Sequence, residues 1–118
     1  METRDDKYTG LRRKLVSNAR AIISDEVGLS MGVRKMCNIL KWLKPYGPIH
    51  VADIGIFEKY DERTRFIPSG TARLCCSKEA FERYDAALDE VNRRLRKKIL
   101  YVCFEIIDKF DIKPEAKP

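Results

Sequence analysis

The sequence predicts an all-α fold: a small helical bundle of about four helices with a long C-terminal helix. Helix-favouring residues are abundant, whereas the 118 residues include only five prolines and six glycines. Over most of the chain, apolar residues recur three and four positions apart, which places them on one face of a helix. A chain of this length fits a single domain, 1–118. We expect its polar ends, residues 1–7 and 113–118, to be flexible.

Two helices are expected in the N-terminal half of the chain. The first runs from Thr9, whose hydroxyl can cap it, to Ile23. Residues 24–26 are polar and interrupt the helical pattern. The second helix continues to Leu43 and ends there, because the residue before Pro45 resists the helical conformation.

The middle of the chain is less regular. Residues 49–60 fit either a short helix or a strand, and we favour the helix because no partner strand is apparent elsewhere. Residues 61–72 are expected to form a loop, whose apolar pair Phe66 and Ile67 folds back onto the core.

The last helix has the clearest pattern. Ser77 is a suitable N-cap, and apolar residues follow in steps of three and four from Phe81 to Phe110. About 30 helical residues extend over roughly 45 Å. Such a helix is long for a domain whose radius of gyration should be only about 13–14 Å.

Two parts of this helix, its basic run and its apolar C-terminal part, are expected to have different surroundings. The basic run at 93–98 lies opposite the apolar stripe. Asp89 and Glu90 stand four residues before Arg93 and Arg94, so we interpret the run as a solvated, partly neutralised face. Tyr101 and Phe104 project from the side that is charged one turn earlier. The other helices should cover them, and the alternative is a homodimer joined through these two aromatic residues.

The net charge of +6 lies mainly in the N-terminal half, because residues 1–50 hold 10 basic and 5 acidic side chains. These cations can meet an acidic protein surface or the phosphates of a nucleic acid, and neighbouring aromatic residues can pack on either partner. We favour the protein partner and keep the nucleic acid as the alternative. The candidate contact residues are Arg12, Arg13, Arg20, Lys41, Trp42, Lys44, Tyr46, Arg63, Arg65 and Phe66.

Nothing in the sequence indicates catalysis, and we expect neither an enzyme nor a cofactor. No CxxC pair accompanies the single histidine, so no metal site is expected. We interpret the four cysteines as buried, reduced thiols, with a nucleophilic pair of His50 and Cys75 or Cys76 as the weakest alternative. Four carboxylates near mid-chain fit solvated loop charges better than a convergent acid–base pair. They are Asp53, Glu58, Asp61 and Glu62.

The compartment follows from what the sequence lacks. No apolar run approaches the roughly 20 residues that a membrane span needs. The charged N-terminus has no apolar stretch of the signal-peptide kind behind it. We therefore expect a cytoplasmic protein with no membrane partner.

Two segments carry a resemblance to known proteins: "ARAIISDEVGLSMGVRKM" at 19–36 and "RFIPSGTARLCCSKEAFERYDAAL" at 65–88. They resemble an uncharacterised group of small bacterial helical proteins. The architecture is also similar to that of the helical immunity proteins of contact-dependent growth inhibition systems. The resemblance covers about a third of the chain and implies a protein that neutralises a cognate toxin, such as a nuclease, by binding it, with no catalytic residues to transfer. The basic charge departs from the acidic character common among nuclease inhibitors, so the toxin would need an acidic surface or apolar anchors.

Overall fold

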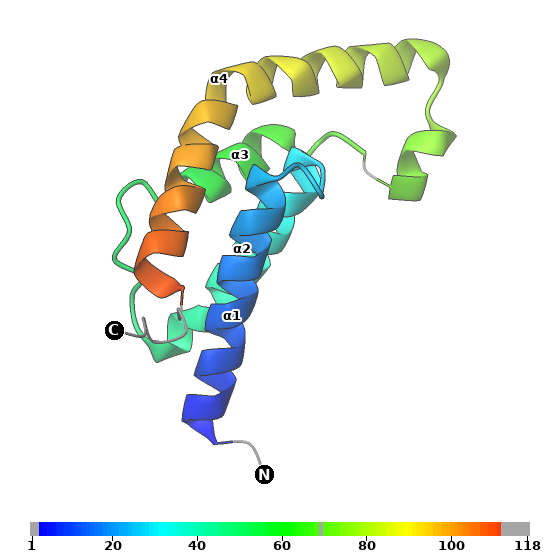
Figure 1. Cartoon of the computed structure of the whole chain (residues 1–118). Coiled ribbons are helices and arrows are strands. Elements are labelled where there is room, and N and C mark those ends of the chain that lie inside the picture. Colours follow the sequence, from blue (N-terminus) through cyan, green and yellow to red (C-terminus); the bar gives the residue numbers. More distant parts are fainter. Residues whose placement is uncertain (1–2, 69, 112–118) are drawn as a thin grey trace.

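The computed structural model describes residues 3–68 and 70–111. In these two ranges the chain forms helices and no strand, so the predicted all-α fold is confirmed (Figure 1). Four α-helices and two short 3-10 helices follow one another: α1 (Arg4–Ile23), α2 (Leu29–Leu43), η1 (Lys44–Tyr46), α3 (Ile56–Thr64), η2 (Gly70–Cys75) and α4 (Lys78–Phe110).

Helix α1 begins five residues earlier than Thr9, the predicted N-cap. The Thr3 hydroxyl accepts a hydrogen bond from the backbone N–H of Asp6 at 3.1 Å, and the Asp6 carboxylate accepts one from the backbone N–H of Thr3 at 3.2 Å. This reciprocal capping box satisfies two backbone donors that have no partner inside the helix. Residues 3–7, which we expected to be flexible, thus form the N-cap and the first turn of α1. The other expected flexible end, 113–118, lies outside the described residues.

Helices α1 and α2 form a tightly packed hairpin, with the chain reversing over residues 24–28. A Cβ atom added at Gly32 would stand only 2.5 Å from Cγ1 of the buried Ile22. The buried side chain of Asn18 donates to the carbonyl oxygen of Gly32 at 2.9 Å. The two backbones approach this closely because position 32 carries no side chain.

Helix α3 starts and ends later than the sequence suggested. Residues 52–55 form turns, and the helix extends to Thr64, so the predicted loop at 61–72 is wrong in its first four residues. Phe57 and Tyr60 of α3 are fully buried in the core. Of the apolar pair after α3, Ile67 is buried whereas Phe66 is 61% exposed. The ring of Phe66 contacts that of Tyr84, with ring centroids 6.3 Å apart.

Helix α4 has two parts with different surroundings. From Leu95 onward it packs against α1 and α3 and supplies six buried side chains to the core. No residue of 78–94, the segment that we call the arm, is buried. Figure 1 shows α4 bent, with the arm (green to yellow) pointing away from the α1–α2 hairpin. The radius of gyration, 16.3 Å, accordingly exceeds the roughly 13–14 Å of a compact chain of this length.

The outer side of α4 stays uncovered. Tyr101 is 62% exposed and Phe104 is 54% exposed. The expectation that the other helices of the bundle cover these two aromatic residues is therefore wrong. Among the described residues, no helix is both long enough and apolar enough to cross a lipid bilayer.

Candidate functional site

A cleft opens between the C-terminal half of α2 and the exposed side of α3. Its volume is about 690 Å³, and the turns between η1 and α3 form one of its walls. Apolar residues, glycines and charged side chains of both signs line it. The lining residues are Cys37, Asn38, Leu40, Lys41, Lys44, Gly47, Pro48, Ile49, Ile54, Gly55, Glu58, Asp61, Glu62 and Arg65. We call this feature the α2–α3 cleft.

Three predicted contact residues meet at the α2–α3 cleft: Lys41, Lys44 and Arg65. Lys41 lies in the last turn of α2, Lys44 begins η1, and Arg65 follows the last residue of α3. Residues that are more than 20 positions apart in the sequence thus line one hollow. The fold therefore brings these three predicted contact residues together, and their contact with a partner stays a prediction.

Three carboxylates also line the cleft, at positions that we interpreted from the sequence as solvated charges. Glu58, Asp61 and Glu62 lie three and four positions apart on α3, which aligns them on one helix face. Asp61 forms ion pairs with Arg65 (Nη2 to Oδ2, 3.3 Å) and Arg34 (Nε to Oδ1, 3.8 Å). The spacing was visible in the sequence and would have indicated a shared face if the helix had been extended to Thr64.

Cys37 is the one thiol among the lining residues. Burial, the carboxylate of Asp61 and that of Glu58 raise the pKa of its thiol to about 11. The thiolate, which is the reactive form, is therefore scarce near neutral pH. Cys37 is therefore a poor nucleophile near neutral pH.

The remaining thiols differ in exposure. Burial raises the pKa of Cys103 to about 12, and its side chain is fully enclosed. Cys75 is exposed and Cys76 is half-buried. The expectation of buried cysteines is thus correct for Cys103 and wrong for Cys75.

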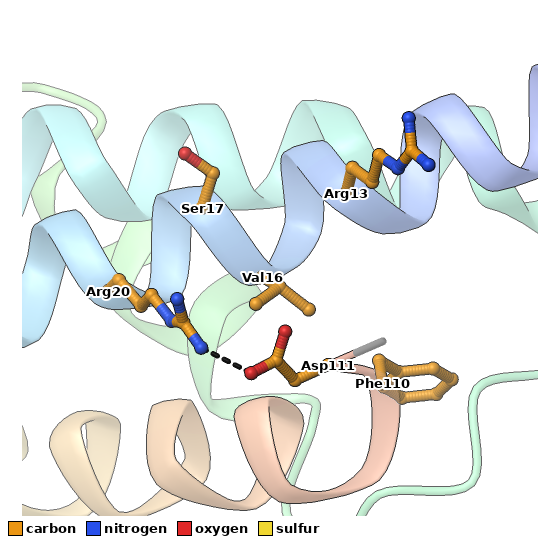
Figure 2. Close-up of a pocket in the computed structure, with 6 residues that line it drawn as sticks. All are labelled: Arg13, Val16, Ser17, Arg20, Phe110 and Asp111. Carbon is orange, nitrogen blue, oxygen red and sulfur yellow. Dashed lines mark hydrogen bonds and ion pairs between the residues drawn. The ribbon is translucent and has the colours of Figure 1, made fainter. Parts of the chain in front are cut away.

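Two predicted contact residues on α1 hold the end of α4. Arg12 Nε donates to the carbonyl oxygen of Phe110 at 3.2 Å, and Arg20 forms an ion pair with the Asp111 carboxylate. A small hollow of about 260 Å³ lies beside this ion pair. In Figure 2 the Arg20 side chain reaches Asp111, whereas Arg13 points away from it. The predicted basic face of α1 is therefore divided by the C-terminal end of α4.

The two aromatic candidates Tyr46 and Trp42 differ in exposure to solvent. Tyr46 is half-buried against Tyr8, with ring centroids 5.6 Å apart, and the Arg4 guanidinium lies 4.9 Å from its ring centroid. It therefore supports the fold where α1 begins and α2 ends. Trp42 is 53% exposed and lies one helical turn from the cleft residue Asn38.

Two further candidates follow one another closely in the chain. Arg63 is exposed in the last turn of α3, and Phe66 comes directly after the cleft residue Arg65. Together with Trp42, Phe66 provides an exposed aromatic side chain close in sequence to residues that line the cleft.

The basic run at 93–98 is partly neutralised, as predicted. Arg93 and Arg94 both donate to the carboxylate of Glu90, and these hydrogen bonds lower the pKa of that carboxyl group. Lys98 lies 3.8 Å from the carboxylate of Asp53. Carboxylates thus accompany three of the five cations of this run.

A search of residues 3–68 and 70–111 finds no cluster of three or more side chains suited to hold a metal ion. No family model, curated protein or solved structure matches the chain.

Proposed function

We propose that the chain is a non-enzymatic binding protein that binds a partner protein at the α2–α3 cleft. The supporting observation is the lining of the cleft, which combines apolar residues with Lys41 and Lys44 and with the carboxylates of α3. A protein segment can offer apolar side chains and both signs of charge to such a lining. The exposed Trp42 and Phe66 belong to the residue types that supply much of the binding energy in protein interfaces.

A phosphate backbone fits the cleft less well. Glu58, Asp61 and Glu62 would repel it, and two of the predicted phosphate contacts, Arg12 and Arg20, are occupied by the end of α4. Nucleic-acid binding therefore remains the alternative and becomes an outcome of the test. A homodimer through Tyr101 and Phe104 would use a different face of the molecule.

The more specific proposal is a cytoplasmic inhibitor of the immunity or antitoxin type, which neutralises a toxin by covering its active site. The similarity of this all-helical architecture to that of helical immunity proteins supports this function. The protonated thiol of Cys37 is also in keeping with a protein that acts by contact. Because the chain is basic overall, the toxin surface that it meets should be acidic.

Co-expression with the toxin candidate encoded beside it provides the test. The protein should restore growth and form a complex measurable by calorimetry. The double variant Lys41→Glu with Lys44→Glu should lose both effects, and Trp42→Ala should weaken binding by about 2 kcal/mol or more if Trp42 is an anchor. The matched control, Lys7→Glu with Lys14→Glu, makes the same charge change on exposed positions of α1 and should bind normally.

Two results would contradict the proposal. In the first, the double cleft variant protects as well as the wild-type protein. In the second, fluorescent tRNA or duplex DNA binds tightly, loses about 10³-fold or more in affinity between 50 and 200 mM salt, and is released by the same cleft substitutions. The second result would assign the cleft to nucleic acid.

A further inference from the structure

The C-terminal part of α4 exposes two large aromatic side chains on its outer side. Tyr101 and Phe104 face away from the side of the helix that enters the core, which carries Leu95, Ile99 and Val102. Exposed aromatic residues side by side are typical of surfaces that another molecule covers. This face is separate from the α2–α3 cleft, which α2 and α3 form.

Charged residues extend this pair into a longer stripe. Lys97 lies four residues before Tyr101, and Asp108 lies four residues after Phe104. All four side chains are exposed, and their spacing of four, three and four places them along one side of the helix. Among the described residues, neither Lys97 nor Asp108 has an ion-pair partner, although nearby Arg94 and Lys98 do. We call these four residues the outer stripe.

The two ends of the outer stripe carry opposite charges, and its two aromatic residues lie between them. It carries a cation, two aromatic rings and an anion. Two copies related by a two-fold axis, with antiparallel α4 helices, would place Lys97 opposite the partner's Asp108 and Tyr101 opposite the partner's Phe104. Each contact then occurs twice, as an isologous interface requires. A parallel arrangement would instead bring like charges together.

We propose that the outer stripe is a self-association surface, on which a second copy of this chain packs its own α4 in the antiparallel direction. Residues 97–108 span only about 18 Å of helix. A contact centred on so short a stretch is small beside the roughly 800 Å² per partner of a standard interface. The dimer should therefore be weak and depend on protein concentration.

Sedimentation equilibrium over a micromolar to millimolar concentration series tests the proposal. The wild-type mass should rise from 13.7 kDa towards twice that value. Lys97→Glu and Asp108→Lys should each remain monomeric, because each places like charges opposite one another across the two-fold axis. An equimolar mixture of the two variants should dimerise, because a mixed pair has opposite charges at both contacts. The chain carrying both substitutions should also dimerise.

Controls separate pairing from folding and from net charge. Circular dichroism should show the same helicity in every variant, since both positions are exposed. Lys14→Glu makes the same change in net charge as Lys97→Glu, but on α1, and should dimerise like the wild type. Tyr101→Ser with Phe104→Ser should remove self-association altogether. A wild-type protein that stays at 13.7 kDa, or folded single variants whose mixture does not pair, would overturn the proposal.

Discussion

The Nε of Arg12 donates a hydrogen bond to the carbonyl oxygen of Phe110, and its guanidinium carbon lies 5.5 Å from the centroid of the Phe110 ring. One side chain on α1 thus satisfies a carbonyl at the end of α4, where no intrahelical donor is available, and also packs on the last aromatic residue of that helix. It joins residues 98 positions apart in the chain. Arg12 therefore supports the fold at a position where its charge alone suggested a contact with a partner.

Replacing Arg12 should consequently reduce stability. Arg12→Ala removes a charge-assisted hydrogen bond and a cation–π contact, and we expect it to lower the free energy of unfolding by about 1–2 kcal/mol. Arg13→Ala, at the exposed neighbouring position, should change it by less than about 0.5 kcal/mol. Urea denaturation followed by circular dichroism measures both. Equal effects at the two positions would show that the contact with Phe110 does not stabilise the protein.

Two glycines on neighbouring helices should respond in opposite directions to the same substitution. At Gly32 a methyl group would clash with the buried Ile22 across the α1–α2 hairpin, so Gly32→Ala should destabilise the protein by about 1–2 kcal/mol. At Gly10 nothing lies within 4 Å of an added Cβ, so Gly10→Ala should stabilise α1 by about 0.5–1 kcal/mol. Thermal unfolding of the two variants measures both changes in stability. A stabilised Gly32→Ala would show that the two helices can separate at no cost.

The elements that the sequence predicted best are those with unbroken periodicity. Ser77 caps α4 as expected, because its hydroxyl accepts from the backbone N–H of Ala80, and α2 ends at Leu43. The end of α3 was missed because its last turn is polar on the cleft side. Only the packing of Tyr60 and Thr64 inside the core shows that the helix continues. The start of α1 was missed because Thr3 and Asp6 act through a capping box, whereas the apolar pattern begins later.

The candidate site was predicted only in part, for a physical reason. Positive charge in a sequence does not show whether a cation faces solvent or another helix. Lys41, Lys44 and Arg65 surround the α2–α3 cleft, whereas Arg12 and Arg20 are occupied by residues at the end of α4. Phe110 and Asp111 are remote in the chain from both arginines. That difference depends on tertiary contacts, which helical periodicity in the sequence does not indicate.

Stability should fall in alkaline solution, and Cys103 should account for part of the loss. Burial raises the pKa of its thiol from 9.0 to about 12, so above pH 9 the unfolded chain releases a proton that the folded chain retains. The contribution is complete below pH 9 and is lost as pH rises towards 12, at up to about 1.4 kcal/mol per pH unit. Cys103→Ala should therefore show a shallower alkaline loss in the free energy of unfolding, measured between about pH 8 and pH 11.

A second variant separates this titration from the loss of packing. Val102→Ala also shortens a fully buried side chain of α4, but it removes no titrating group. It should lower stability by a similar amount at every pH and leave the alkaline slope of the wild type unchanged. If Cys103→Ala kept the wild-type slope as well, the thiol would not be the group responsible.

Amide hydrogen exchange should divide α4 near Leu95. The helix is continuous from Lys78 to Phe110, but only its second part contributes buried side chains. No residue of the arm, 78–94, is buried, and Leu88 and Val91 pack only partly against the core, so the amides of the arm should open locally and exchange faster than those after Leu95. Hydrogen-exchange mass spectrometry with peptides from either side of Leu95 measures the difference.

One contact tests how the arm is held. Phe66 packs on Tyr84 from outside α4, so Phe66→Ala should speed exchange in the arm and leave the core part of the helix unchanged. Tyr101→Ser changes an equally exposed aromatic residue beyond Leu95 and should leave exchange in the arm as it is. Uniform slow exchange along the whole of α4 would contradict this prediction. It would mean that another molecule covers the arm in solution.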